Sequence, residues 1–500
     1  MMTQRLRCIF VLGLLLTFPA CGTGGSGSDS GSDEGSVETF QAPPIPALGV
    51  ETIQVVATDG AGNANVIILN GPGSGDDVVI SGGTYPLIIA LRNAIPGSEP
   101  VIGIYGKIRG DGMQIGGGDS DSKAYVAHWG AVPMRFCIVG KTPDATIGEL
   151  GFLNRMNSGV VNGGVEDARF DDLTIEARWT SSVGGPKGHR FGLIRFYNCH
   201  FATSEEGLAA GSYSGFGFKW GVRIRALGRY DFRNCSFDPV LEHAIYIDSP
   251  QGDSYFIGIE HNGSTRTAIQ VVNRSFDYFI TDPTDADGNG IADELEAVLA
   301  QYESGALTPQ PSGYGRLLFE DITIRDLRGD GGSGITIAGH LGDIIIRGVD
   351  ATDLTDPFHG VIVIWTDAGQ KHGTFLYTGA DGGQYSTQSV TIDDVNVNLA
   401  FADRAHIAIS GCELVQFEGF TIQGNQTAIS LDSTYGAAQL DDDVVVLDGS
   451  VTRSSELIIN GQVEFLMARP VSLYPGFQST WKIKIGTDTL SNNDIDALWP

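Results

Sequence analysis

The sequence predicts an all-β chain that winds into a solenoid of parallel strands. The first observation behind this prediction is a six-residue pattern: an apolar residue, any residue, Asp, Asn or Gly, an apolar residue, any residue, and an apolar residue. Copies of it begin at Phe170, Phe196, Phe232, Phe319, Ile346, Ile392 and Phe417, with weaker copies at Ile259 and Leu447. Four of the eight steps between these starts span 25 to 27 residues. A fixed step with alternating apolar residues is typical of a solenoid whose repeat consists of strands.

A second motif follows these copies along the chain. It is a small or polar residue followed by apolar, any and apolar residues, and it starts at Gly221, Ala244, Ala268, Gly334, Gly360 and Ala428. Two strands in each step of about 26 residues leave room for a third short strand and turns, but no room for a helix.

With both motifs, residues 50–467 resemble a right-handed parallel β-helix of the pectate-lyase type. The resemblance implies coils of short strands around an apolar interior, closed by a cap at each end. It implies no particular chemistry, because that fold hosts lyases, hydrolases and non-enzymatic surface proteins.

The composition narrows the class of partner. The formal net charge is −29, which argues against a nucleic acid and favours a soluble monomer. Cys199 and Cys235 hold the same repeat position in successive copies. We therefore expect them to stack inside the solenoid as free thiols, with a disulfide as the alternative.

The chain begins with a predicted secretory leader over residues 1–20. Arg5 and Arg7 precede an apolar run, as in signal peptides. The end of this run, Phe18-Pro19-Ala20-Cys21, resembles a bacterial lipoprotein signal and implies acylation of Cys21; simple secretion is the alternative. Residues 21–41 predict a flexible Gly/Ser/Asp tether. We therefore expect a secreted protein, held at the outer membrane or cell surface through its lipid anchor alone.

The remaining segments follow in order. Residues 42–169 predict the N-terminal cap and first coils, with Gln41–Leu48 as an extended lead-in and Leu87–Ile95 as a short capping helix. Residues 170–467 predict the regular coils, interrupted by insertions at 274–315 and 365–388. Residues 468–500 predict a further strand and the C-terminal cap.

The first insertion contains a twelve-residue pattern with oxygen-bearing side chains at positions 1, 3, 5, 9 and 12 and Gly290 at position 6. Ca²⁺ prefers six to eight oxygen ligands, and the glycine allows the chain to turn around the ion. The predicted ligands are Asp285, Asp287, Asn289, the carbonyl of Ile291, Asp293 and Glu296. The segment resembles an EF-hand loop and the calcium repeats of dockerin and thrombospondin type 3. We expect a structural Ca²⁺ followed by a helix over Ile291–Ser304; a solvated acidic turn is the alternative.

The predicted coils also bring polar and aromatic side chains together. Two outward columns are expected: Arg223, Tyr246, Gln270, Thr336, Ile362 and Ser430, and Arg225, Asp248, Val272, Ala338, Ile364 and Asp432. The candidate surface near the middle of the solenoid consists of Lys219, Trp220, Arg223, Arg225, Glu242, His243, Tyr246, Asp248 and Arg266.

This mixture suits an acidic polysaccharide, because aromatic rings stack on sugars and Arg or Lys pair with uronate carboxylates. In a polysaccharide lyase, Arg223 or Arg225 would neutralise the carboxylate, and His243, Lys219 or Tyr246 would remove the adjacent proton. Trp220, Glu242, Asp248 and Arg266 would bind the sugar. A hydrolase would instead use Glu242 and Asp248 as its two carboxyl groups. The sequence leaves open whether the chain is an enzyme. His243 at a coil corner also fits a purely structural hydrogen bond, and a non-catalytic adhesion scaffold is the alternative function.

Overall fold

The computed structural model divides the chain into two units, Met1–Pro44 and Ile45–Pro500. Every strand in the described part of the chain lies in the second unit. The structure describes residues 40–56, 67–70, 88–92, 100–108, 124–128, 134–148, 150–154, 165–177, 181–184, 193–203, 218–224, 228–248, 250, 252–272, 315–327, 332–340, 342–354, 360–365, 387–399, 407–410, 412–423, 429–432, 455–465, 471–473, 481–485 and 488–490.

The described strands form two long sheets. The 18-stranded sheet contains β1 (Ile53–Val56), β4 (Val101–Tyr105), β5 (Lys107–Ile108), β7 (Met134–Gly140), β8 (Thr146–Ile147), β10 (Val165–Asp171), β11 (Thr174–Ala177), β13 (Leu193–Tyr197), β14 (His200–Thr203), β16 (Arg229–Phe237), β18 (Ser254–His261), β20 (Leu317–Ile324), β22 (Ile344–Leu354), β24 (Thr387–Leu399), β26 (Cys412–Gln423), β28 (Ser455–Phe465), β30 (Trp481–Ile485) and β31 (Asp488–Leu490). The 13-stranded sheet contains β2 (Ile67–Asn70), β3 (Ile88–Arg92), β6 (Ala124–His128), β9 (Leu150–Asn154), β12 (Ser181–Gly184), β15 (Phe218–Ile224), β17 (Val240–Asp248), β19 (Ile269–Val272), β21 (Ser333–Ala338), β23 (Gly360–Trp365), β25 (Ile407–Ser410), β27 (Ile429–Asp432) and β29 (Val471–Leu473).

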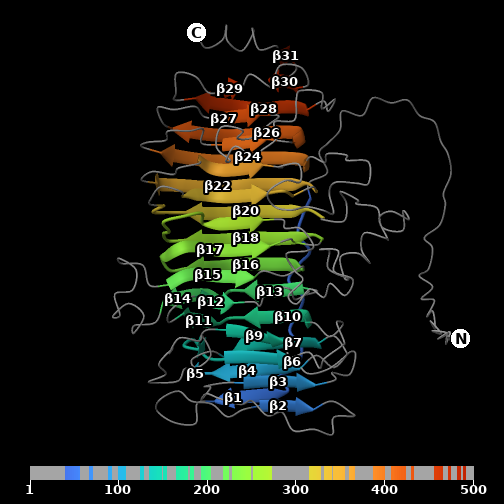
Figure 1. Cartoon of the computed structure of the whole chain (residues 1–500), viewed down its shortest axis with the longest axis vertical. Helices are drawn as coiled ribbons and strands as arrows, with labels where there is room; N and C mark the ends of the chain where they lie inside the picture. Colours follow the sequence, from blue (N-terminus) through green and yellow to red (C-terminus); the bar gives the residue numbers. More distant parts are fainter. Residues whose placement is uncertain are drawn as a thin grey trace, which may run out of the picture. The chain divides into compact units, whose positions relative to one another are not determined.

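From β15 to β30 the chain passes alternately from one sheet to the other. Thus β16 pairs in parallel with β18, and β15 pairs in parallel with β17. Figure 1 shows the strands stacked in sequence order. Among the described strands, the only antiparallel pair is β30 with β31. The expected all-β class with long parallel sheets is confirmed, and the arrangement is compatible with a solenoid. The described residues include no helix that is long and apolar enough to cross a membrane.

The third position of the six-residue pattern marks a sharp bend within the strands of the 18-stranded sheet. Positive φ angles occur there at Asp172, Asn198, Asn234, Gly258, Asp321, Gly348 and Asp394. Only Gly, Asn and Asp adopt this left-handed conformation readily, which explains why the pattern restricts this position. The side chains also bond from coil to coil, because Asn198 Nδ2 donates to Asp172 Oδ1 at 3.0 Å.

The interior is an apolar core in which equivalent residues of successive coils stack. Phe170, Phe196, Phe232, Phe256 and Phe319 are fully buried. Their ring centroids are 4.7 to 5.6 Å apart from one coil to the next. In-register parallel pairing brings these identical side chains together. The stack therefore fixes the register of the central coils.

Cys199 and Cys235 are free thiols in the core, as expected. Cys137, Cys199 and Cys235 are free and buried. The thiol groups of Cys199 and Cys235 lie 3.4 Å from the backbone carbonyl oxygens of Phe170 and Phe196. Burial raises the pKa of the Cys235 thiol to about 12. A disulfide between them is absent.

Two of the expected repeat starts require correction. The copy assigned to Ile259 starts at Phe256, because Phe256 is the residue in register with Phe232 and Phe319. Its Gly258 occupies the bend. The copy assigned to Leu447 lies outside the described residues, and the residue in register with Phe417 is Ile459.

The outward columns on the 13-stranded sheet also differ from expectation beyond Thr336 and Ala338. Thr336 is in register with Val363, not Ile362, and Ala338 is in register with Trp365, not Ile364. The segment Gly360–Trp365 is apolar from Val361 onward, so its inward and outward faces cannot be told apart from alternation. In addition, β25 is a strand that neither sequence motif identified.

The expected capping helix over Leu87–Ile95 is wrong. Its residues Ile88–Arg92 form β3, which pairs in parallel with β2 and β6. The second insertion is also shorter than expected, since β23 ends at Trp365 and β24 begins at Thr387. The leader, the tether as far as residue 39, and the calcium loop with its helix lie outside the described residues.

Candidate functional site

Three neighbouring strands of the 13-stranded sheet, β15, β17 and β19, carry the candidate surface. Arg223 is in register with Tyr246, and Tyr246 is in register with Gln270. These three side chains are half-buried, so they face outward. Three residues earlier along the same two strands, Trp220 is in register with His243. Parallel strands are about 4.8 Å apart, so the surface covers only adjacent coils.

Small residues between these positions hold the strands close together. A Cβ atom at Gly221 would lie 2.5 Å from the carbonyl oxygen of Ala244 and 2.6 Å from the Phe237 ring. A side chain at Gly221 is therefore excluded, and Ala244 is fully buried beside it. This packing explains the small residue that opens the second sequence motif. It also places Trp220 and Arg223 on the outside, on either side of a buried Gly221-Val222 pair.

Arg223 joins the two aromatic rings of the surface. Its guanidinium carbon lies 4.0 Å from the centre of the Trp220 ring and 5.9 Å from the centre of the Tyr246 ring. Both distances are within the range of cation–π attraction. The contacts restrict the guanidinium and the rings to one arrangement in which a cation lies beside two aromatic faces.

His243 lies against the same cluster, but it is nearly covered. Its ring centre is 5.3 Å from that of Tyr246, and 5% of the residue is exposed. Its Nδ1 lies 2.9 Å from the carbonyl oxygen of Thr267. A carbonyl oxygen can only accept, so Nδ1 carries the hydrogen and the neutral ring has its lone pair on Nε2. Thr267 was not recognised as part of this surface from the sequence.

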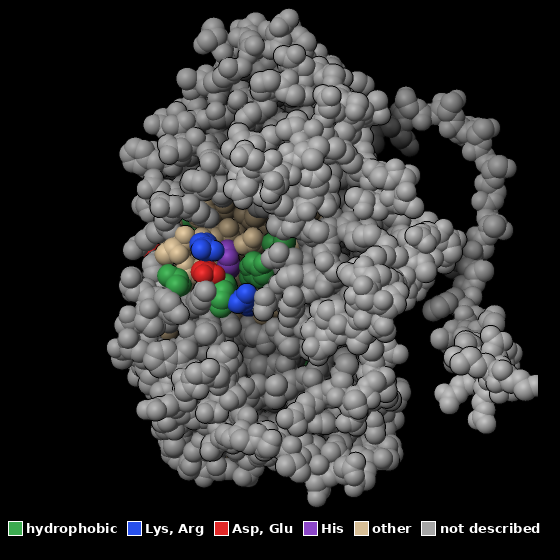
Figure 2. All heavy atoms as spheres, viewed as in Figure 1, with side chains coloured by type: hydrophobic (Ala, Val, Ile, Leu, Met, Phe, Trp, Pro, Cys, Tyr) green, Lys and Arg blue, Asp and Glu red, His purple; other side chains and the backbone are tan. Residues whose placement is uncertain are grey.

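Glu242 and Arg266 flank the cluster on neighbouring coils. Pairing of Val240 with Ser264 and of Ile245 with Ile269 gives the same offset of 24 residues on both sides, so Glu242 lies beside Arg266. Arg266 is exposed and Glu242 is half-buried. Figure 2 shows basic, acidic, His and hydrophobic side chains gathered in one area of the visible face.

The structure brings five of the nine expected surface residues into one described cluster with side chains: Trp220, Arg223, Glu242, His243 and Tyr246. Arg266 borders it. The backbones of Lys219 and Asp248 lie in β15 and β17 beside the cluster, and Arg225 lies outside the described residues. Towards the C-terminus the outward column becomes inaccessible, because Thr336 and Val363 are buried.

Comparison of the chain with protein-family models, curated sequences and solved structures gives no match. The function therefore has to be argued from this surface itself.

Neither the expected calcium ligands nor the lipidation site Cys21 falls within the described residues. In the described part of the chain, no three His, Cys, Asp or Glu side chains are grouped closely enough to hold a metal ion. The calcium site thus stays a prediction from the sequence.

Proposed function

We propose that this chain is a right-handed parallel β-helix protein that binds an acidic polysaccharide at the surface formed by Trp220, Arg223, Glu242, His243, Tyr246, Gln270 and Arg266. The observation that carries the proposal is the position of the Arg223 guanidinium between the Trp220 and Tyr246 rings. A sugar ring packs against an aromatic face, and a guanidinium pairs with a carboxylate through two hydrogen bonds. The cluster offers both interactions within two adjacent coils.

The register of the two sheets supports the finer fold assignment. Successive segments of the chain add parallel strands to both sheets in turn, and the equivalent apolar residues stack inside. A β-helix has this arrangement. The handedness follows from the general preference of parallel crossovers for the right-handed connection.

Binding is the core of the proposal, and cleavage by elimination is its narrower form. In elimination, a base removes the proton next to the uronate carboxylate, the C–O bond to the next sugar breaks, and the leaving oxygen takes up a proton. Arg223 is placed to pair with the carboxylate. The lone pair of His243 Nε2 is the basic site of the cluster, although the small exposure of this ring leaves Tyr246 as the better placed group to touch a sugar. Elimination suits this set better than hydrolysis, which needs two carboxyl groups at a defined separation.

The test uses the full chain without its leader, in calcium-containing buffer. Binding to alginate, polygalacturonate, pectin and glycosaminoglycans is measured by calorimetry, with unsaturated product and new reducing ends followed in parallel. We expect Arg223→Ala and Tyr246→Ala each to weaken binding at least about tenfold, as for loss of a charge-assisted or stacking contact. Arg229→Ala is the matched control, because Arg229 is an exposed arginine on the other sheet.

The outcomes separate the alternatives. Unsaturated product that disappears in Arg223→Ala establishes elimination at this surface, and reducing ends without unsaturated product point to Glu242 and Asp248 as a hydrolytic pair. Binding without product leaves a carbohydrate-binding protein. If no acidic polysaccharide binds to the folded chain, the proposal fails and the non-catalytic surface scaffold takes its place. The proposed lipid anchor at Cys21 would place either protein at the cell surface.

A further inference from the structure

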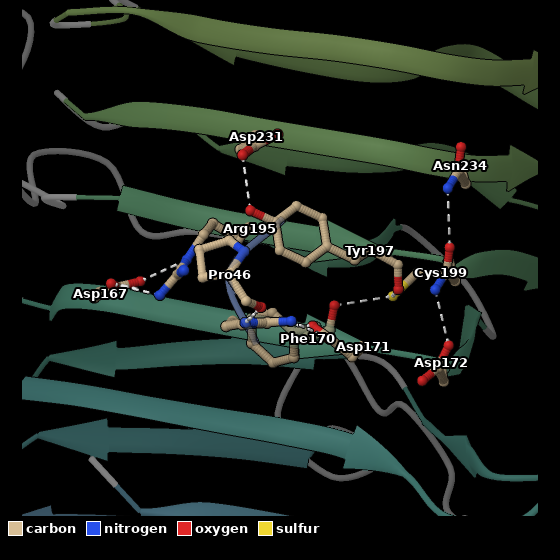
Figure 3. A network of polar contacts seen from close by, with 12 residues as sticks. Pro46, Asp167, Phe170, Asp171, Asp172, Arg195, Tyr197, Cys199, Asp231 and Asn234 are labelled. Atoms are coloured by element: carbon tan, nitrogen blue, oxygen red, sulfur yellow. Dashed lines mark hydrogen bonds and ion pairs between the residues drawn. The ribbon is translucent and has the colours of Figure 1, made fainter. Parts of the chain in front are cut away.

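The outward face of the 18-stranded sheet carries a second polar surface, which we call the charged ladder. It consists of Asp167, Arg169, Asp171, Arg195, Tyr197, Asp231 and Arg233 on β10, β13 and β16. Residues of successive strands follow in register in two columns, Arg169–Arg195–Asp231 and Asp171–Tyr197–Arg233. Figure 3 labels Asp167, Asp171, Arg195, Tyr197 and Asp231 of the ladder on these strands.

Each arginine of the ladder pairs with an aspartate through two nitrogens. Arg169 binds Asp171 at 2.6 and 2.8 Å, Arg195 binds Asp167 at 2.5 and 2.9 Å, and Arg233 binds Asp231 at 2.7 and 2.9 Å. Tyr197 adds an O–H bond to Asp231 at 2.7 Å. The charges of the three pairs balance, so the ladder as a whole is neutral.

The ladder is buried although it lies on the outside of the sheet. Its three arginines, Asp171 and Asp231 are each 4 to 7% exposed, and Tyr197 is 1% exposed. Burying charges is costly unless each one is paired and hydrogen-bonded. A surface that is both fully paired and covered therefore indicates a built contact rather than a solvated face.

Part of the cover is the segment Ile45–Val50, which we call the strap. The carbonyl oxygen of Pro46 accepts a hydrogen bond of 2.7 Å from Arg169 Nη1. Arg169 Nε and Nη2 are used by Asp171, so the strap takes the third edge of the same guanidinium. Figure 3 labels Pro46 in this network of polar contacts.

A second contact lies further along the strap, over an apolar cluster of Val101, Cys137 and Val139. A Cβ atom at Gly49 would lie 3.2 Å from Val101 Cγ2, so the backbone passes close to this cluster. Cys137 and Val139 are in register with Arg169 and Asp171. The apolar cluster and the charged ladder therefore form one continuous surface under the strap.

The strap makes few directional contacts of its own. In the described part of the unit, backbone–backbone hydrogen bonding begins at Thr52, whose N–H donates to the Val101 carbonyl. Ile45 and Leu48 are 38% and 37% exposed, and Val50 is 86% exposed. Segments with few buried apolar contacts open at low free-energy cost.

We propose that the charged ladder is a docking surface for an extended, proline-containing peptide, and that the strap is its resident, releasable occupant. Recognition is through a main-chain carbonyl, so it depends on an extended backbone more than on a side chain. Pro46 fixes its own φ and gives the segment the polyproline-like form that such surfaces select. Because the ladder pairs its own charges, it persists when the strap leaves, and Arg169 then loses the Pro46 carbonyl as a hydrogen-bond acceptor.

The test is limited proteolysis of the full chain with thermolysin, combined with binding of a fluorescent peptide that copies residues 41–50. Pro46→Gly loosens the strap and keeps the ladder. Arg169→Ala removes the ladder's contact with the strap. We expect thermolysin to cleave both variants within residues 45–50 at least about tenfold faster than the wild type, because cleavage requires the strap to leave the ladder and each variant lowers the free-energy cost of that opening. The peptide should bind to Pro46→Gly and not to Arg169→Ala.

Arg229→Ala, at an exposed arginine of β16 outside the ladder, should behave as the wild type in both measurements. Arg169→Lys preserves the charge opposite Asp171 and covers the case in which Arg169→Ala does not fold; it should also lose the peptide, because the ammonium group lacks the planar fork with which the guanidinium serves Asp171 and Pro46 from separate edges. Unchanged cleavage of the strap in Pro46→Gly, or peptide binding by Arg169→Lys that is as strong as by Pro46→Gly, would overturn the proposal.

Discussion

Asn234 donates its side-chain amide to the side-chain oxygen of Asn198, one coil earlier, over 3.1 Å. Both residues have positive φ angles, of 54° and 53°. At these two bends, asparagine thus meets two requirements: a left-handed backbone and a polar side chain that reaches the neighbouring coil.

Substitution at Asn234 should separate these two requirements. Asn234→Ala should lower the free energy of unfolding by about 2 kcal/mol, since it removes the hydrogen bond and places an ordinary residue at positive φ. Asn234→Gly should cost less, because glycine accepts this φ. Chemical denaturation measures both, and Glu260→Ala, on an exposed extended residue of β18, is the control. Equal losses for Ala and Gly would show that the backbone conformation contributes nothing.

The aromatic stack predicts a large effect at its centre. Phe232 is fully buried, with rings at 5.1 Å and 5.6 Å on its two sides. Phe232→Ala should destabilise the chain by about 3–5 kcal/mol, and Phe232→Leu by less, because the cavity is smaller. The measurement is the midpoint of denaturant unfolding, with Val56→Ala at an exposed position as the control. A loss below about 1 kcal/mol for Phe232→Ala would contradict the close packing of the coils.

A buried histidine predicts sensitivity to acid. Burial lowers the pKa of His261 from 6.5 to about 4. Between these values the unfolded chain binds more protons than the folded chain, so the free energy of unfolding decreases as the pH falls from about 6.5 to about 4, by roughly 3 kcal/mol from this residue. His261 is in register with Phe237 and Ile324, so His261→Leu preserves an apolar contact in the core.

His261→Leu should therefore flatten the decline in stability over this pH range, measured as the denaturation midpoint at each pH. His340 keeps its own contribution in both proteins, since burial lowers its pKa to about 3. Val56→Ala, at an exposed position, is the control variant because it changes no titratable group. A wild-type slope that persists in His261→Leu would mean that other groups cause the acid sensitivity.

The calcium loop predicted from the sequence is tested by direct titration. We expect one Ca²⁺ per chain by calorimetry and a rise in melting temperature on adding calcium, because an ion that binds only the folded state stabilises it. Glu296→Gln should weaken binding at least about tenfold by removing the predicted bidentate ligand. Asp441→Asn, in another acidic run, is the matched control. An unchanged melting temperature in millimolar calcium would favour the solvated acidic turn.

The bends and the stacked core residues of this fold could be predicted from the sequence, but the strap that covers the charged ladder could not. The restricted third position of the pattern and the Phe series identified the bends and the core, because both requirements act within one coil or between adjacent coils. The register at Val363 was missed because alternation gives no information in a uniformly apolar strand. Strand β25 was overlooked, although its Ile407 and Ile409 fit the apolar–any–apolar motif. The strap was expected only as an extended lead-in. Pro46 and Arg169 are 123 residues apart in the sequence. A repeat pattern gives no information about a contact between residues so far apart.

The candidate site likewise has features that the sequence predicted and features that it did not. The neighbourhood of Arg223, Tyr246 and His243 followed from repeat spacing alone. The burial of His243 and its bond to Thr267 did not, because they depend on how the corner of the next coil closes over the ring.

The pairing of Val272 with Ala338 brings together residues on either side of a long intervening segment, and Trp365 pairs with Ser410 across another. The coils before and after these segments keep one register, so the packing of the core does not depend on the length of the intervening segments. Such positions can accept grafted sequence. A foreign antigen or a small enzyme placed between residues 274 and 314 should be displayed beside an unaltered series of coils, which makes the chain a usable carrier for surface display.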